Sequence, residues 1–468
     1  MNRTGKKLIC GMAVMLSLSC GCGQTAQVAG TGGMVKVGSY NVEREVVYTD
    51  ESPTDKLIDT YTSDDGLCEI KKYSTYYDVT LDYENGSSAE VGAAYARTIL
   101  NAVPDYAGTL EPYLYENIRL AFRGRNVNYE ALEKRILTLE ASIKEEYREE
   151  IESFAKNLSG GEEGYAENGK LSYIEAITMQ MIPDALRPTA CSALSLGGSM
   201  TESGERITMR NLEWYIGSQS QMTKIHTVTH MKKADRSLTM ISMLGILDTI
   251  TAVNDDGVVL AILDVGSTTS GTDGMPFVSE GKKCYTFEMR YALEQFDNAR
   301  DAGEFLVGES GDFTWCNNLL VSDKKDAFCC ENATSEVQAA GKAISVLRGT
   351  DTELMEGLSW DHPDALCIVN SFAAKGNMDY FTADDMNIDR FEKYNKWVSE
   401  KDKFSVADIK AMMAQEIVDQ YEVVNVHNSG TVHTVIVDYA TGDINVAFTQ
   451  DYYVEDVPEY VNVGKYRY

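Results

Sequence analysis

Apolar and polar residues alternate in two short runs near the middle of the chain, at residues 191–196 and 207–212. A period of two is typical of β-strands, and a Ser-Gly pair between the runs favours a turn. The pattern therefore predicts a hairpin. Because antiparallel partners face each other, Cys191 at the start of the first strand should lie beside residues 210–213 at the end of the second.

A different spacing, of three and four, runs through residues 129–158. Apolar side chains recur on one face, Glu and Lys fill the other, and Ser-Gly-Gly follows. This predicts a single long helix with a core-facing side. A Ser-x-x-Glu capping box at Ser172 predicts a second, short helix. Other helices are expected at residues 89–100, 286–296, 301–306 and 407–415.

Strand-like segments fill most of the chain after residue 190. Their β-branched and aromatic content, and the turns between them, predict antiparallel hairpins. They are expected at residues 76–83, 224–231, 238–244, 249–264, 318–323, 326–331, 366–369, 431–437 and 444–448. Strands and helices in this order predict an α+β protein with two mainly antiparallel sheets between helices.

The first 24 residues have the pattern of an export signal. A basic start is followed by an apolar stretch at residues 8–18, too short to span a bilayer, and then by Ser19-Cys20-Gly21-Cys22. This resembles a bacterial lipoprotein signal, with Cys20 or Cys22 as the lipidated residue. An ordinary secretory signal is the alternative. We expect an exported protein held at the outer face of the cell membrane by a lipid anchor only.

Composition excludes some classes of partner and site. The chain has 42 Lys and Arg against 72 Asp and Glu, a formal net charge of −30, so nucleic acid is not an expected partner. No CxxC or His-spaced metal pattern occurs, and we expect no metal and no cofactor. His226 and His230 share a strand face, where metal binding or a Cys-His base is a less favoured interpretation than a structural role.

Cysteine arithmetic leaves one thiol over. Seven cysteines follow the signal, an odd number, so at least one has no disulfide partner within the chain. They lie at positions 68, 191, 284, 316, 329, 330 and 367.

Cys191 is the candidate nucleophile. A neighbouring guanidinium favours a thiolate, and Arg210 is placed to supply one. If the Ala190-Cys191 bond were cut, the new α-amino group, with a pKa of roughly 7.7 to 8, could serve as the thiol's own base. Glu213 could hold that amine in position. The alternative is a buried strand cysteine without chemistry.

Two further polar residues follow in the second half of the chain. Asn370 ends the apolar strand at residues 366–369, where a side-chain amide could stabilise an oxyanion. Arg390 lies twenty residues further on.

The order of these residues resembles that in the N-terminal-nucleophile amidases, which include choloylglycine hydrolases, acid ceramidase and isopenicillin N acyltransferase. In that family a Cys is followed some twenty residues later by Arg-Asn-x-Asp and an aromatic residue; here the run is Arg210-Asn211-Leu212-Glu213-Trp214, with Glu in place of Asp. Residues 286–294 resemble a family helix. The resemblance also implies an oxyanion role for Asn370, an active-site role for Arg390 and a substrate-side place for Asp264.

The resemblance implies a four-layer α-β-β-α sandwich and a self-cleaving precursor. The expected parts are a signal at residues 1–24, a tether and irregular segment at 25–75, a largely helical propeptide at 76–190 and a catalytic domain at 191–468. Cleavage at Ala190-Cys191 would leave two associated chains.

The implied activity is hydrolysis of the C–N bond of a linear N-acyl amide through a Cys191 thioester. Bile-salt conjugates, N-acyl amino acids, N-acyl ethanolamines, ceramides and penicillins are all open as substrates. An acyltransferase that passes the acyl group to an amine, and a catalytically silent ligand-binding lipoprotein, are the alternatives.

Overall fold

The computed structural model describes residues 55–122, 126–186, 190–265, 279–377, 385–416, 426–428, 430–450 and 458–466. It also assigns two short paired strands nearer the N-terminus, β1 (Met34–Lys36) and β2 (Glu43–Glu45). The expected signal, with Cys20 and Cys22, lies outside the described residues, as do residues 187–189 before the expected cleavage site.

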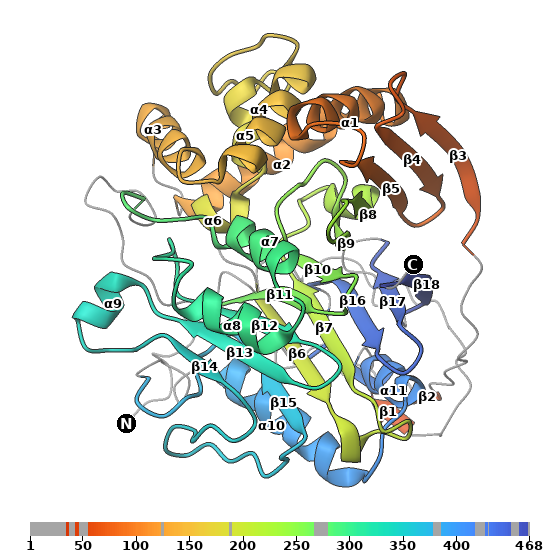
Figure 1. Cartoon of the computed structure of the whole chain (residues 1–468), viewed down its shortest axis with the longest axis vertical. Helices are drawn as coiled ribbons and strands as arrows, with labels where there is room; N and C mark the ends of the chain where they lie inside the picture. The colour runs from red at the N-terminus through yellow and green to blue at the C-terminus, as the bar shows by residue number, and fades with distance from the viewer. Residues whose placement is uncertain are drawn as a thin grey trace.

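Two β-sheets form the centre of the molecule (Figure 1). The larger has ten strands in the order β14-β13-β12-β11-β10-β9-β8-β5-β4-β3. Along the chain these are β3 (Leu57–Thr62), β4 (Cys68–Tyr73), β5 (Tyr77–Asp82), β8 (His226–Lys232), β9 (Leu238–Met243), β10 (Thr251–Asn254), β11 (Val259–Asp264), β12 (Asn317–Ser322), β13 (Ala327–Asn332) and β14 (Val346–Arg348).

The smaller sheet has six strands in the order β15-β6-β7-β16-β17-β18. They are β6 (Ala190–Leu196), β7 (Ile207–Glu213), β15 (Ala365–Ile368), β16 (Thr431–Asp438), β17 (Asp443–Phe448) and β18 (Tyr460–Lys465). Most of the predicted hairpins are therefore confirmed, including the one that carries Cys191. Strand β18 was not predicted.

Helices cover the outer faces of both sheets. Helices α7 (Tyr285–Gln295) and α8 (Ala299–Val307) pack on β10 to β14 of the larger sheet. Helices α10 (Asp385–Glu400) and α11 (Val406–Glu416) cover the other face of the smaller sheet, where Leu194 and Met209 pack against Phe391 and Met413. A short helix, α9 (Ser335–Ala339), follows β13. The α+β class and the α-β-β-α order of layers are as expected.

The region before residue 190 is largely helical and shares the larger sheet. Its helices are α1 (Ser88–Ala102), α2 (Tyr106–Ala121), α3 (Tyr129–Glu140), α4 (Glu145–Ser159), α5 (Tyr173–Met179) and α6 (Ile182–Ala185). Most of these helices gather at the top of Figure 1. Strand β5 pairs in parallel with β8, from Tyr77 opposite Thr227 to Asp82 opposite Lys232, so the two parts of the chain are joined by main-chain hydrogen bonds.

The prediction of one helix over residues 129–158 was wrong. Helix α3 ends at Glu140 and α4 begins at Glu145. At the break, the N–H and hydroxyl of Ser142 both turn back to the Leu139 carbonyl. Ile143 is buried within the break, so the apolar stripe continues through it although the helix axis does not. A serine that bonds its local backbone competes with helix propagation, and the glutamates after it favour a new N-terminus.

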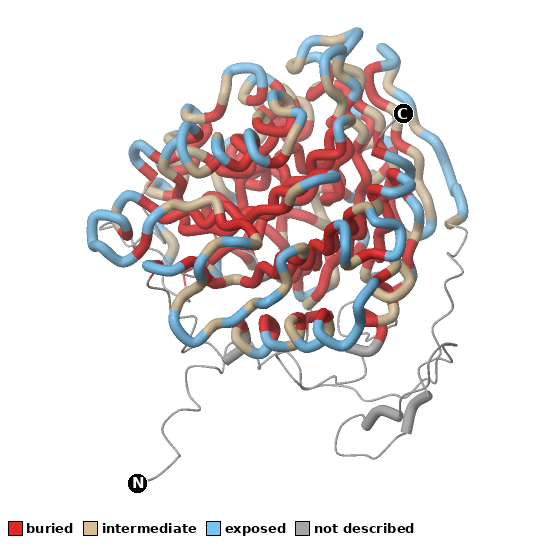
Figure 2. Tube along the Cα trace, turned by 60° about the horizontal axis from the view of Figure 1, so that its bottom comes forward, coloured by how far each residue is buried: buried red, intermediate tan, exposed pale blue. Residues whose placement is uncertain are grey.

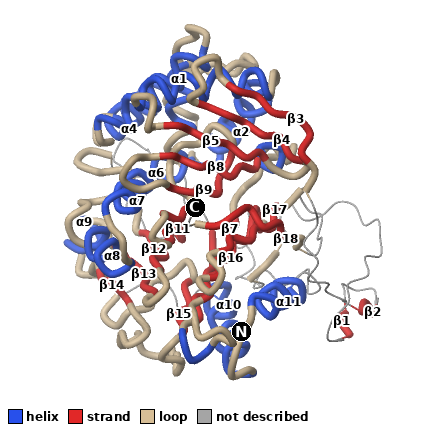
Figure 3. Tube along the Cα trace, turned by 45° about the vertical axis from the view of Figure 1, so that its right-hand side comes forward, coloured by secondary structure: helices blue, strands red, loops and turns tan. Residues whose placement is uncertain are grey.

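The expectation of an irregular segment up to residue 75 was also wrong in its later part. Strands β3 and β4 occupy residues 57–73 and extend the larger sheet beyond β5 (Figure 3). The residues of β3 are almost all exposed, as suits an edge strand. Its sequence lacks an alternating apolar pattern because most of its side chains are exposed and only Tyr61 packs against the core.

Burial is concentrated in the strands and along the inner faces of the helices (Figure 2). The seven cysteines from Cys68 onwards are all buried and none forms a disulfide. Within the described ranges, no helix has both the length and the apolar character required to cross a bilayer.

Candidate active site

The hairpin β6–β7 brings the first two candidate residues together. Cys191 pairs with Leu212, and Ala193 pairs with Arg210. Since paired side chains share a face, Cys191 and Arg210 both project between the two sheets, while Ser192 projects under α10 and bonds the Tyr394 hydroxyl. Cys191 is completely buried in this chain. The predicted proximity of Cys191 to residues 210–213 is confirmed.

Arg210 donates directly to the cysteine sulfur. Its Nη2 lies 3.3 Å from Cys191 Sγ and 2.9 Å from the carbonyl oxygen of Ile262 on β11, while Nη1 lies 3.1 Å from Nε2 of His433. Burial lowers the pKa of Arg210, and the negative charges of its neighbours oppose that shift. A guanidinium at this distance stabilises a thiolate more than a thiol.

Asn370 follows β15 and meets the backbone of the cysteine. Its Oδ1 accepts from the N–H of Cys191 at 2.6 Å and from Arg390 Nη2 at 3.0 Å. Its Nδ2 donates to the carbonyl oxygen of Asp264 at 2.6 Å. Two donors on one side and an acceptor on the other define which end of the amide is the oxygen.

Arg390, on α10, links the other members of the site. Its Nη1 lies 3.1 Å from the carbonyl oxygen of Cys191 and 3.1 Å from Oε2 of Glu213. Glu213 is buried, and burial raises its pKa, while the charges of Arg390 and Arg210 act in the opposite direction. All five residues expected at the catalytic centre, Cys191, Arg210, Glu213, Asn370 and Arg390, therefore form one connected group.

Ala190 and Asp264 lie at the margins of this group. Ala190 begins β6 and pairs with Glu213, which places the expected scissile bond beside the Glu213 backbone. Asp264 reaches Asn370 through its main-chain oxygen, and its carboxylate accepts from the Tyr285 hydroxyl at 2.6 Å.

A second buried carboxyl lies near Asp264. Asp184, on α6, accepts from the hydroxyl of Thr286 at 2.6 Å. Burial raises its pKa to about 8, and the nearby charge of Asp264 adds to the shift. The neutral carboxyl is therefore the favoured form of Asp184 at pH 7 in the folded chain.

Sequence reasoning missed two residues of the site. Asn387 Oδ1 accepts from the Asn370 N–H at 2.9 Å and from Arg390 Nη2 at 2.7 Å. It lies three residues before Arg390, a spacing that would have placed both on one face had α10 been predicted. The other is His433, on β16, which the strand pattern alone could place only on a sheet face.

The two histidines considered as metal ligands or as a base have ordinary partners. His226 Nε2 lies 2.6 Å from the Thr449 carbonyl oxygen, and His230 Nδ1 lies 3.1 Å from Thr239 Oγ1. Burial lowers the pKa of His226 to about 4. Among the described residues, no group of three His, Cys, Asp or Glu side chains is arranged to hold a metal ion.

Comparison with protein-family models and with curated proteins finds no match. Among solved structures, the chain resembles a Caenorhabditis elegans N-acylethanolamine-hydrolyzing acid amidase ortholog (14% identity, TM-score 0.34), over 53% of this chain and 92% of the other.

A mutant conjugated bile acid hydrolase from Clostridium perfringens matches at 11% identity and a TM-score of 0.35, over 58% of this chain and 92% of the other. Penicillin V acylase from Agrobacterium tumefaciens matches at 12% identity and a TM-score of 0.33, over 58% of this chain and 86% of the other. Likeness at this level carries no functional weight, so chemistry has to be inferred from the residues around Cys191.

Proposed function

We propose that this protein is a self-activating hydrolase of linear amides, with Cys191 as the nucleophile. Cys191 cuts the Ala190-Cys191 bond, becomes an N-terminal residue and then hydrolyses the C–N bond of a small N-acyl amide. The two resulting chains stay associated. We also propose that the protein is exported and is anchored to the membrane by a lipid on Cys20 or Cys22.

The contact between Arg210 and the cysteine sulfur is the observation that carries this proposal. A buried guanidinium 3.3 Å from Sγ is an arrangement that a merely structural cysteine does not need. The second support is Asn370, whose amide oxygen accepts from the backbone nitrogen that cleavage would convert into an amine.

Self-cleavage would begin with attack of Cys191 Sγ on the Ala190 carbonyl carbon. The C–N bond breaks, the nitrogen of Cys191 takes the proton that the thiol gave up and leaves as an amine, and a thioester links Ala190 to Sγ. Water then attacks the thioester, which releases the Ala190 carboxylate and the thiol. Ala190 is the first residue of β6 and pairs with Glu213 at the end of β7, so this bond lies at the edge of the polar group.

The amide substrate would follow the same chemistry. The free α-amino group takes the thiol proton, the thiolate attacks the substrate carbonyl, and the leaving amine receives that proton. Asn370 uses one N–H of its amide on the Asp264 carbonyl. In this proposal its second N–H stabilises the oxyanion. Water hydrolyses the acyl thioester and regenerates Cys191.

Glu213 and Arg390 would hold the new N-terminus. Arg390 donates both to the Cys191 carbonyl and to Glu213, so the charged pair is built around the residue that becomes the N-terminus. The buried carboxylate also offers a partner for the ammonium form of the freed amine.

The test is intact mass and N-terminal sequencing of the purified protein beside Cys191→Ala and Cys330→Ala variants. Cys330 is an equally buried strand cysteine and serves as the matched control. We expect two fragments in the wild type and in Cys330→Ala, one beginning Cys-Ser-Ala-Leu, and one intact chain in Cys191→Ala. An uncut wild type would contradict the proposal. A panel of N-acyl amides, with and without an added amine, then separates hydrolysis from acyl transfer.

A further inference from the structure

His433 faces Arg210 from the neighbouring strand. It pairs with Leu212, and Val435 pairs with Arg210, so all four side chains share the inner face of the smaller sheet. Its Nε2 lies 3.1 Å from Arg210 Nη1 and 3.4 Å from Thr251 Oγ1, which belongs to the larger sheet. His433 is completely buried.

The contact determines the protonation state of the imidazole. Guanidinium nitrogens carry only N–H donors, so Nε2 must present its lone pair to Arg210 and the ring proton must reside on Nδ1. Burial and the positive charge of Arg210 lower the pKa of His433 well below its ordinary value. The ring is therefore neutral.

A neutral acceptor has a particular effect on Arg210. Its direct acceptors are Cys191 Sγ, the Ile262 carbonyl and His433 Nε2. Within the part of the chain that the structure describes, no carboxylate forms an ion pair with Arg210. A carboxylate in direct contact would cancel much of the guanidinium charge, whereas the imidazole fixes its orientation and adds no charge. The charges of Asp264 and Glu213 act on Arg210 without an ion pair between them.

We propose that His433 is a positioning residue that holds the Arg210 guanidinium against the Cys191 thiolate. The inference rests on the proposed function of Cys191 as a nucleophile. His433 does not touch the sulfur and acts only through Arg210, so its removal should raise the pKa of the Cys191 thiol.

The experiment measures the pKa of the Cys191 thiol in the cleaved enzyme. Iodoacetamide alkylation of Cys191 is followed by peptide mapping across pH, alongside the pH profile of kcat/KM and the thermal midpoint. His433→Leu removes the hydrogen-bond acceptor and has a similar side-chain volume. His433→Gln keeps an acceptor oxygen near the position of Nε2. The side chain of His433→Asn is shorter, so its oxygen does not reach Arg210. His226→Leu is the control for loss of a buried histidine.

We expect His433→Leu and His433→Asn to be alkylated about tenfold more slowly at pH below the thiol pKa, which corresponds to a rise of about one unit. His433→Gln should restore most of the rate, and His226→Leu should keep the wild-type thiol pKa. If His433→Leu does not fold, the thiol pKa of His433→Gln compared with that of His433→Asn tests the role of His433.

Two outcomes separate failure of this inference from failure of the proposed function. A cleaved, active enzyme whose thiol pKa is unchanged in His433→Leu, or equal in the Gln and Asn variants, would overturn the role of His433 alone. An uncut wild type, with a Cys191→Ala variant of equal activity, would overturn both.

Discussion

The backbone N–H of Cys191 donates to Oδ1 of Asn370 at 2.6 Å, although the two residues are 179 positions apart. The contact orients the Asn370 amide, because its oxygen is taken by Cys191 and Arg390 and its nitrogen must point the other way. A single side chain thus touches the nitrogen that cleavage would free and carries its amide nitrogen on the opposite side, where one N–H bonds the Asp264 carbonyl.

Asn370→Asp should reduce kcat by about 10²- to 10³-fold, as expected for loss of one oxyanion donor. The carboxylate retains an acceptor for Cys191 and Arg390 but cannot donate. Steady-state kinetics on an accepted N-acyl amide, with active sites counted by alkylation, is the measurement. Asn377→Asp is the control, since Asn377 is a buried amide that bonds Glu331. Equal kcat in Asn370→Asp and wild type would rule out the oxyanion role.

We expect the side-chain oxygen of Asn387 to contribute to catalytic efficiency. Asn387→Leu removes the acceptor shared by the Asn370 N–H and Arg390, so both groups lose a fixed position, whereas Asn387→Asp keeps it. We expect lower kcat/KM in the Leu variant and substantially milder loss in the Asp variant. Kinetics at matched thermal midpoints is the readout. A Leu variant as active as wild type would show that Asn387 is not needed.

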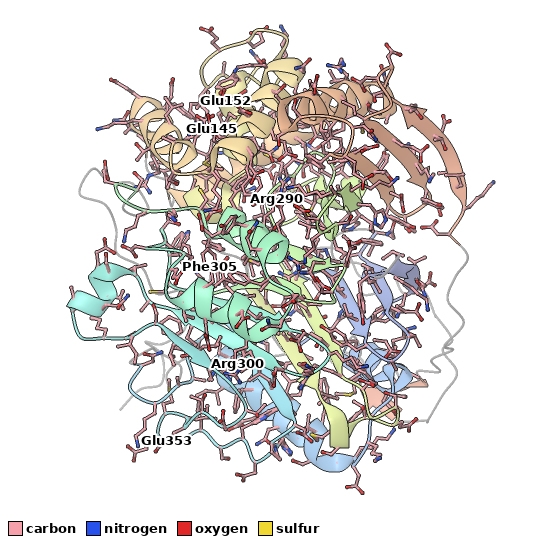
Figure 4. All side chains as sticks on the ribbon, in the orientation of Figure 1. Glu145, Glu152, Arg290, Arg300, Phe305 and Glu353 are labelled. Carbon is pink, nitrogen blue, oxygen red and sulfur yellow. The ribbon has the colours of Figure 1, made fainter. Side chains whose placement is uncertain are left out.

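A buried ion pair joins the two parts of the chain that cleavage after residue 190 would separate. Arg290 Nη1 lies 2.5 Å from Oε2 of Glu150, and both side chains are buried. Arg290 is labelled on its helix in Figure 4. Glu150 belongs to α4 and Arg290 to α7, so the pair bonds the part before residue 190 to the part after it.

Glu150→Gln should lower the free energy of unfolding by about 1 to 3 kcal/mol, because the buried Arg290 guanidinium loses one charged partner and keeps the other, Glu294, 3.2 Å away. Urea denaturation of the uncut Cys191→Ala chain is the measurement. Glu152→Gln, which affects only more exposed pairs with Lys156 and Arg148, should cost about 1 kcal/mol or less. Equal losses in the two variants would contradict the assignment.

Asp184 predicts a pH dependence of stability. Its pKa of about 8 in the folded chain lies above the value of an unfolded Asp, so the folded state binds the extra proton between about pH 4 and pH 8. Its contribution is complete below about pH 4 and is lost as the pH rises through about 8.

In the wild type, titration of Asp184 should lower the free energy of unfolding by up to about 1.4 kcal/mol per pH unit between about pH 4 and pH 8. Asp184→Asn mimics the neutral carboxyl and should abolish this contribution to the slope. Denaturation of the Cys191→Ala chain at pH 5, 6 and 7 measures it. Asp248, whose pKa is raised by burial, leaves part of the slope in place. Asp361 is exposed, so Asp361→Asn is the control and should leave the slope unchanged. If Asp184→Asn had the same slope of stability against pH as the wild type, the prediction would be refuted.

Local pattern by itself determined the hairpin at Cys191, most of the other strands and helices α1, α5, α7, α8 and α11. These elements carry their own signals: a period of two, a capping box, or a turn between apolar runs. Cys191, Arg210, Glu213, Asn370 and Arg390 were singled out because their order along the chain resembles that in an amidase family. Their proximity followed from strand pairing only for the first three.

Tertiary structure alone decided the remainder. The break between α3 and α4 depends on hydrogen bonds of Ser142 that do not interrupt the apolar stripe. Strand β3 lacks a strand pattern because it is an exposed edge, and it is held by pairing with β4. Pairing with a neighbouring strand is not encoded in the periodicity of an exposed strand.

The site shows the same division. Asn370 and His433 contact the Cys191 hairpin because β15 and β16 flank it in the smaller sheet. Asn387 contacts Asn370 and Arg390 because α10 covers one face of that sheet. A polar residue in a strand or helix has the same local sequence whether it faces solvent or a buried guanidinium. The sequence therefore specified which side chains the protein has available, and the packing of sheets and helices decided which of them surround Cys191.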